Sequence, residues 1–140
     1  MSEQNKKIAR RMFEEGEGQG NLAVIDELIA NDFVNHTPFG EMHGQEPARQ
    51  FILMLRQGFP DLEVTVEDQV AEGDRVATRW TARGTHQGEF QGVPPTGNPM
   101  EISGIAVARL ANGKVIEQWA NPNLLSLMQQ IGAVPMPDQG

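Results

Sequence analysis

The 140-residue sequence contains no cysteine. This absence excludes disulfides, thiolate zinc sites, iron–sulfur clusters and a cysteine nucleophile. The sequence also lacks an apolar run near the roughly 18 to 20 residues that span a bilayer, and residues 1–11 are polar where a signal peptide would be apolar. We therefore expect a cytoplasmic protein without a membrane partner.

Positive charge is scarce as well. Eleven Lys and Arg stand against 19 Asp and Glu, which gives a net charge of -8. Binding to a nucleic-acid backbone needs clustered basic side chains, and the one close basic group, within residues 6–11, has the spacing of a solvated helix face. The charge balance therefore argues against a nucleic-acid partner.

Apolar spacing predicts three helices in the first 60 residues, over 8–13, 22–29 and 47–58, with a short strand near residue 33. Asn21 is placed to cap the second helix. The glycine-rich residues 16–20 separate the first two helices, and we expect them to form a flexible connection.

From Leu62 onward the apolar period changes from 3.6 to 2, which predicts strands. One antiparallel hairpin is expected over 62–85 and a second over 100–120, where Asn112-Gly113 is the strongest turn signal. A short amphipathic helix over 124–131 follows. The chain length fits one domain over residues 1–140. Helices followed by a meandering sheet predict an α+β fold, with a cavity for a small molecule between the two layers.

Several short motifs occur in a familiar order: Asp32-Phe33-Val34-Asn35-His36, Phe59-Pro60-Asp61-Leu62, Glu72-Gly73-Asp74-Arg75-Val76, segments 84–90 and 92–97, segment 109–119, and Gln129-Gln130-Ile131-Gly132. Together they resemble the SnoaL-like polyketide cyclase family over nearly the whole chain. The resemblance implies an NTF2-like cone, in which a strongly curved antiparallel sheet packs on three N-terminal helices and a short C-terminal helix. It also implies a homodimer formed through the sheet.

In activity, the resemblance implies ring closure of a polyketide ester by aldol condensation, without a metal or a cofactor, although relatives include hydroxylases. The family's cyclases use an aspartate four residues after a strand tryptophan as the general acid and base. In this sequence that position, counted from Trp119, is Asn123, an amide that does not titrate. Asn123 could still donate a hydrogen bond to a ligand oxygen, whereas Asn121 is better explained as the cap of the last helix.

His36 and His86 are the candidate proton carriers, because imidazole titrates near neutral pH. Each also has a structural interpretation, His36 as a hydrogen-bonded residue at a strand end and His86 as a residue that fixes the bend near Gly84 and Gly88. The aromatic and apolar candidates for ligand contact, which could equally be core residues, are Trp80, Phe90, Ile105 and Trp119.

The spacing of the three histidines fits no metal motif, and no nucleophile elbow is present. The sequence therefore supports two hypotheses. The first is a cofactor-independent protein that binds a hydrophobic, carbonyl-bearing, polyketide-like molecule and carries out cyclase-type acid–base chemistry. The second is a binding module with the same fold and no catalysis. Water activation of the limonene-epoxide-hydrolase kind would need an Asp-Arg-Asp set for which no convincing spacing exists.

Overall fold

The computed structural model describes residues 2–135. The helical elements are α1 (Ser2–Arg11), the π-helix η1 (Met12–Glu17), α2 (Ala23–Leu28), α3 (Gln45–Gly58) and α4 (Leu124–Gln130). The strands are β1 (Ile29–Thr37), β2 (Gly40–His43), β3 (Glu63–Glu72), β4 (Arg75–Thr85), β5 (Pro99–Ala111) and β6 (Lys114–Pro122). None of the helices in this range is long and apolar enough to cross a membrane.

The six strands form one sheet in the order β2-β1-β6-β5-β4-β3. Both predicted hairpins are confirmed, β3–β4 with a left-handed Gly73 in its turn and β5–β6 with left-handed Asn112 and Gly113. The sheet departs from the predicted antiparallel pattern in one pairing, because β1 lies parallel to β6. The chain between these two strands, which runs through α3 and four other strands, is long enough to permit the parallel pairing.

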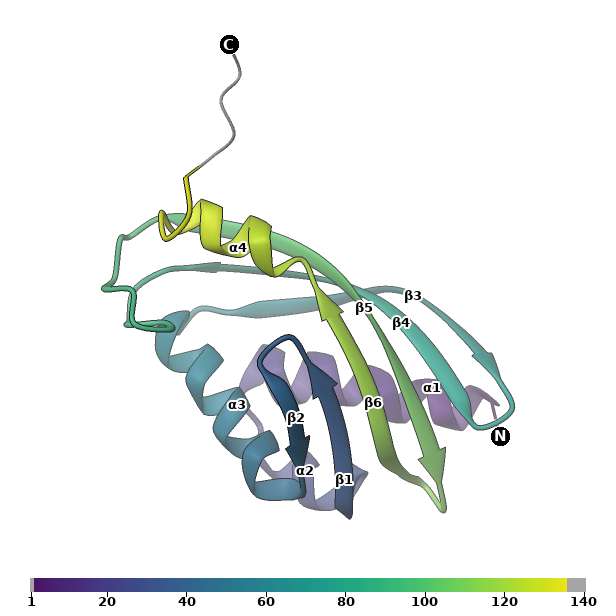
Figure 1. Cartoon of the computed structure of the whole chain (residues 1–140). Helices are drawn as coiled ribbons and strands as arrows, with labels where there is room; N and C mark the ends of the chain where they lie inside the picture. The colour runs from purple at the N-terminus through teal and green to yellow at the C-terminus, as the bar shows by residue number, and fades with distance from the viewer. Residues whose placement is uncertain (1, 136–140) are drawn as a thin grey trace.

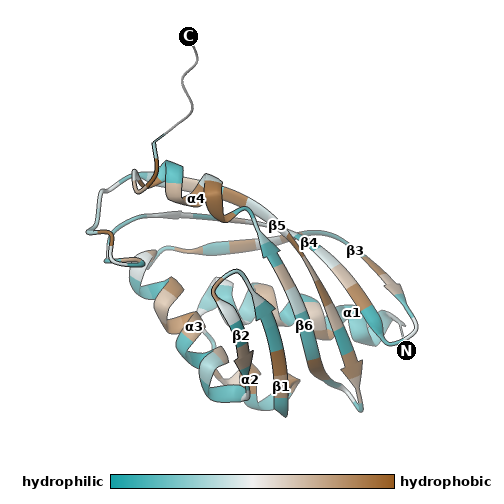
Figure 2. Ribbon diagram, viewed as in Figure 1, coloured by the Kyte–Doolittle hydropathy of each residue, from teal (hydrophilic) through white to brown (hydrophobic). Residues whose placement is uncertain are grey.

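The sheet curves over the helices, as Figure 1 shows, with α1, α2 and α3 on its concave side. Helix α4 lies at the end of the sheet where β5 begins and β6 ends. The side chain of Gln130 fastens it there, since its amide donates to the Glu101 carbonyl at 2.9 Å and accepts from the Glu101 amide at 2.8 Å. Apolar and polar residues alternate along the strands (Figure 2), as expected of a sheet with one buried face. The predicted α+β, NTF2-like architecture is confirmed.

Residues 16–20 do not form the flexible connection that the glycines suggested. Helix α1 runs directly into η1, which continues to Glu17. A Cβ atom at Gly16 would lie 3.2 Å from Val24 Cγ2, and one at Gly18 would lie 3.2 Å from the Val64 nitrogen. These glycines therefore permit the helix to pack closely against α2 and β3. The N-cap position of α2 is Leu22 and not the predicted Asn21, although Asn21 Oδ1 accepts from the amide of Ala23, the first residue of the helix, at 3.2 Å.

The core consists of three apolar clusters, one around α1, α2 and β1, one around α4 and the β4–β5 end of the sheet, and a small one around Phe13. Residues of all three clusters line a common cavity. The helices do not fill the concave side of the sheet completely, and the unfilled space lies where the clusters meet.

Candidate functional site

The cavity lies between the helices and the inner face of the sheet and has a volume of about 110 Å³. Most of its wall is apolar, contributed by η1, α2, α3, α4 and the inner sides of four strands. Phe39 and Phe51, whose ring centroids are 6.2 Å apart, contribute from the β1–β2 turn and from α3. Among the described residues, those in the wall with polar side-chain atoms are Glu17, Asn35, Thr37, Trp80 and Gln118.

Of the residues that the structure describes, Glu17 is the one carboxylic acid in this wall. It is the last residue of η1 and belongs to residues 16–20, which the sequence had suggested to be a flexible connection. Burial raises the pKa of its carboxyl group from 4.5 to about 7, and no charge or hydrogen bond within residues 2–135 offsets that rise. A carboxyl group with this pKa can take and return a proton at neutral pH.

Arg56 of α3 holds the end of η1 in position. Its guanidinium donates to the carbonyl of Gly18 at 3.0 Å and to that of Glu17 at 3.4 Å. The same group donates to the carbonyls of Leu62 at 2.7 Å and Pro60 at 2.9 Å. One side chain therefore joins the backbone that carries Glu17 to the segment that leads into β3.

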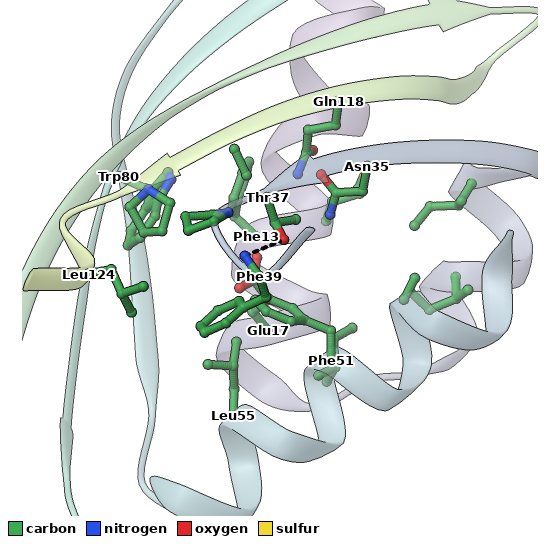
Figure 3. A pocket seen from close by; sticks show the side chains of 18 of the residues that line it. Phe13, Glu17, Asn35, Thr37, Phe39, Phe51, Leu55, Trp80, Gln118 and Leu124 are labelled. Atoms are coloured by element: carbon green, nitrogen blue, oxygen red, sulfur yellow. Dashed lines mark hydrogen bonds between the residues drawn. The ribbon is translucent and has the colours of Figure 1, made fainter. Parts of the chain in front are cut away.

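Trp80 and Phe90, two of the predicted ligand contacts, lie in the cavity wall. Figure 3 shows Trp80 with Asn35 and Gln118 on the strand side of the cavity, and Phe51 and Leu55 on the α3 side. Thr37 directs its hydroxyl into its own turn, where it accepts from the Phe39 amide at 3.1 Å and donates to the Gly40 carbonyl at 2.9 Å.

Ile105 and Trp119, the other two predicted contacts, lie on the outer face of the sheet and not in the cavity. Ile105 is 51% exposed. The inner side of β5 carries the small residues Gly104, Ala106 and Ala108, because the concave face is crowded by Trp80 and the helices. In this stretch of β5 the larger residues, Ile105 among them, therefore alternate outward, contrary to the prediction for Ile105.

His36 also lies on the outer face, outside the cavity wall. Its ring stacks on Trp119 at a centroid distance of 5.4 Å, and its Nε2 lies 2.8 Å from Glu117 Oε2. Arg109 donates to the other oxygen of Glu117 at 2.9 Å. The hydrogen bonds from His36 and Arg109 lower the pKa of Glu117. This cluster of a histidine, a carboxylate and an arginine is separated from the cavity by the sheet.

His86 is completely buried behind the cavity wall. Its Nδ1 accepts from the Thr96 amide at 3.3 Å, and its ring packs against Phe59 at a centroid distance of 5.6 Å. Phe59 in turn packs against Phe90, which lines the cavity. These contacts fit the structural interpretation, in which His86 fixes the loop that follows β4.

Asn123 is exposed and caps α4, since its Oδ1 accepts from the Ser126 amide at 3.2 Å. It does not line the cavity. The prediction that Asn121 caps this helix is wrong, because Asn121 is the exposed outer-face residue of β6 that pairs with Ile105. The helix begins at Leu124, as the apolar pattern predicted, and its cap is Asn123, two residues after Asn121.

Within residues 2–135, no three histidine, aspartate or glutamate side chains lie close enough together to hold a metal ion.

Sequence reasoning missed Glu17, Asn35 and Gln118. A signal for Glu17 exists, because it follows Phe13 by four residues and thus continues the apolar side of the first helix. The surrounding glycines obscured it. Asn35 and Gln118 could have been found from strand alternation, since each lies two residues from an inward-facing position.

The model of the SnoaL-like polyketide cyclase family matches residues 7–131. Among curated proteins, the aklanonic acid methyl ester cyclase DauD of Streptomyces sp. (strain C5) is 26% identical over 132 residues, which cover 89% of this chain and 80% of DauD.

Among solved structures, a protein from Jannaschia sp. CCS1 described as a SnoaL-like polyketide cyclase superposes with a TM-score of 0.86 at 36% identity, covering 96% of this chain and 95% of that one. AclR from Streptomyces galilaeus, described as a hydroxylase, superposes with a TM-score of 0.87 at 29% identity, covering 99% and 87%. With the fold, the cavity and the family match in agreement, the chain belongs to the SnoaL-like polyketide cyclase family.

Proposed function

We propose that this protein binds a hydrophobic, carbonyl-bearing, polyketide-like molecule in the cavity and catalyses cyclase-type acid–base chemistry on it, with Glu17 as the proton carrier and no cofactor. The observation that carries this proposal is the carboxyl group of Glu17, which lines an apolar cavity and has its pKa raised to about 7 by burial. Perturbed carboxyl groups in clefts are frequent at catalytic sites.

The proposed reaction begins when the Glu17 carboxylate removes a proton from the carbon next to a ligand carbonyl. The resulting enolate carbon attacks a second carbonyl of the same molecule, so that a carbon–carbon bond forms and the attacked oxygen becomes an alkoxide. That alkoxide takes the proton back from Glu17, which returns the carboxylate to its starting state. The apolar wall holds the two ends of the ligand together, which lowers the entropic part of the barrier.

Glu17 would take the role that the family resemblance assigns to an aspartate at position 123. Here that position is an amide occupied with capping α4. The carboxyl group would thus reach the ligand from the helix layer.

The test is deuterium exchange at the α-carbon of 2-tetralone, a bicyclic ketone, followed by proton NMR in D2O. Wild type should accelerate exchange over buffer with a rate that rises with pH around 7. Glu17→Gln should lower the accelerated rate by about 10²- to 10⁴-fold, the usual contribution of a general base. Glu117→Gln is the matched control, because that carboxyl lies outside the cavity, and it should retain the wild-type rate. Full exchange activity in Glu17→Gln would refute the role of Glu17.

The alternative is a binding module without catalysis, which the amide at position 123 favours. It predicts that 2-tetralone binds, as measured by calorimetry, while wild type exchanges its α-protons no faster than buffer does.

We further propose a homodimer that packs through the outer face of the sheet. Ile105 is 51% exposed there and Val70 is 71% exposed, and burying such side chains would stabilise association. Light scattering after gel filtration measures this directly.

A further inference from the structure

Two polar atoms in the cavity wall have no partner. Asn35 Oδ1 and Trp80 Nε1 are both enclosed, and within residues 2–135 neither forms a hydrogen bond. Both residues line the cavity, where Figure 3 shows them on its strand side. One atom is an acceptor and the other is a donor. Buried polar groups are nearly always paired, so two unpaired ones in the same cavity require an explanation.

The indole of Trp80 is held rigidly. Its ring stacks on Phe13 at a centroid distance of 6.1 Å and an interplanar angle of 24°. On another side it lies against Gly104, where a Cβ atom would come within 2.4 Å of Trp80 Cζ2. A ring with so little freedom presents its N–H in one fixed direction, as a preorganised donor must.

Asn35 is held by the sheet. It lies on β1 directly opposite Gln118 of the parallel strand β6, and the two residues are 9% and 6% exposed. Asn35 Oδ1 forms no hydrogen bond among the described residues, and both residues line the cavity. The β1–β6 pair therefore places two amide side chains next to each other in the cavity wall.

These two atoms set requirements on a ligand. An acceptor such as a ketone oxygen can pair with the Trp80 N–H, and a hydroxyl group can donate to Asn35 Oδ1. A ligand without these groups leaves a buried donor or acceptor unpaired, which makes its binding weaker. Apolar walls alone discriminate poorly between ligands of similar size. The Trp80 N–H and Asn35 Oδ1 therefore determine which of these ligands binds more tightly.

We propose that Trp80 and Asn35 are the specificity-determining residues of the cavity, with the Trp80 N–H binding a ketone oxygen and Asn35 Oδ1 binding a hydroxyl hydrogen. The ligand class is therefore a hydrophobic hydroxyketone. Trp80 acts in this arrangement as a hydrogen-bond donor and not as a stacking surface. The inference rests on the proposed function for the identity of the site, but it concerns binding and requires no turnover.

The test uses calorimetric titration with three positional isomers, 5-, 6- and 7-hydroxy-1-tetralone. Their methyl ethers lack the hydroxyl hydrogen, and the matching tetrahydronaphthols lack the ketone. The isomers sample different separations of the two groups. Wild type should bind at least one isomer about 5- to 100-fold more tightly than either its ether or its tetrahydronaphthol, the discrimination expected when a buried partner is left unpaired.

Two variants separate the roles. Asn35→Leu should abolish the preference for hydroxyl over methyl ether and retain the preference for ketone. Trp80→Phe keeps an aromatic ring without the N–H, and it should abolish the preference for ketone and retain the preference for hydroxyl. The matched controls are Asn121→Leu and Trp119→Phe, the same substitutions on the outer face of the sheet, which should change neither ratio.

Affinity ratios within one variant are used because a general loss of stability weakens all ligands alike. The proposal is overturned if wild type binds none of the isomers, if it shows no preference, or if both ratios survive in the cavity variants. Its outcome is separate from that of the proposed function, because the ratios are compared among wild type, Asn35→Leu and Trp80→Phe, which all retain Glu17, and they require no turnover.

Discussion

One carboxyl group lies on each side of the sheet, Glu17 in the helix layer on the concave side and Glu117 on the outer face, and their pKa values are shifted in opposite directions. On the concave side, burial among apolar side chains raises the pKa of Glu17 to about 7. On the outer side, hydrogen bonds from His36 and Arg109 lower the pKa of Glu117. The outer carboxylate is fixed in its charged form by its partners, whereas the inner one can change charge near neutral pH. The comparison shows that partners, and not residue type, decide which acid is suited to move protons.

The largest expected effect is on stability as a function of pH. Glu17 has a higher pKa in the folded than in the unfolded protein, so wild type loses stability as the pH rises from about 4.5 to about 7. The rise in pKa corresponds to about 3 kcal/mol. Urea unfolding should therefore show Glu17→Gln equal to wild type near pH 4 and more stable by up to about 3 kcal/mol at pH 8.

Glu117→Gln provides the contrast in the same measurement. Because the folded pKa of Glu117 is lowered, its contribution is present above the unfolded pKa and is lost as the pH falls through the folded value. Its stability difference from wild type should thus be small, of opposite sign, and largest at neutral pH. If the stability difference from wild type changed with pH in the same direction in Glu17→Gln and Glu117→Gln, the opposite pKa shifts of the two carboxyl groups would be contradicted.

A second prediction concerns Gly104, the inner-face residue against which Trp80 packs. In Gly104→Ala the new methyl group would lie 2.4 Å from Trp80 Cζ2 and 2.9 Å from Pro122 Cα, so the ring or the strand must move. We expect a loss of about 1–3 kcal/mol in the free energy of unfolding, as is usual for overpacking. Ser103→Ala, the exposed neighbour on the outer face, is the control and should have almost no effect on urea unfolding.

A third prediction addresses the outer face as an interface. Ile105→Glu places charges where two copies would meet, so light scattering at increasing protein concentration should show a larger fraction of monomer than in wild type. Exchange of 2-tetralone should continue in the monomer, because Ile105 does not line the cavity. An unchanged distribution of species would contradict packing through this face.

The smallest effect is expected for His36→Ala. His36 was the strongest histidine candidate for catalysis in the sequence, but it contacts Glu117 and Trp119 on the outer face. We expect the exchange rate to stay within about twofold of wild type, since a residue that acts as the general base would cost far more. If His36→Ala lowered the exchange rate as much as Glu17→Gln does, the proton-transferring group would have to be assigned to the outer face of the sheet.

Periodicity predicted much of the fold because it reports local burial. The change of period at Leu62, the turn at Asn112-Gly113 and the final helix were all found in this way. The outward position of Ile105 could not be predicted in the same way, because the small residues of β5 face inward to make room for Trp80. The parallel pairing of β1 with β6 depends on contacts distant in sequence, which no local pattern contains.

The candidate site was harder to predict than the fold. The family pattern directed attention to Asn123, which the structure uses as a helix cap. Glu17 stands between Gly16 and Gly18, and these glycines obscured the four-residue spacing from Phe13 that places its side chain on the apolar side of the helix. The raised pKa comes from residues of α2, α3 and the sheet that meet only in the folded molecule.

The π-helical turn of η1 determines which way its last residue points. A π-helix makes i→i+5 hydrogen bonds, so each of its residues advances by less than the roughly 100° of an α-helix. The same six residues in regular α-helical geometry would therefore turn the acid to a different direction. The strands and their pairing would be untouched. A π-helical turn in one helix can therefore direct a proton-transferring side chain into an existing cavity. Restoring α-helical geometry there would turn that side chain away while the other residues of the cavity wall stay the same.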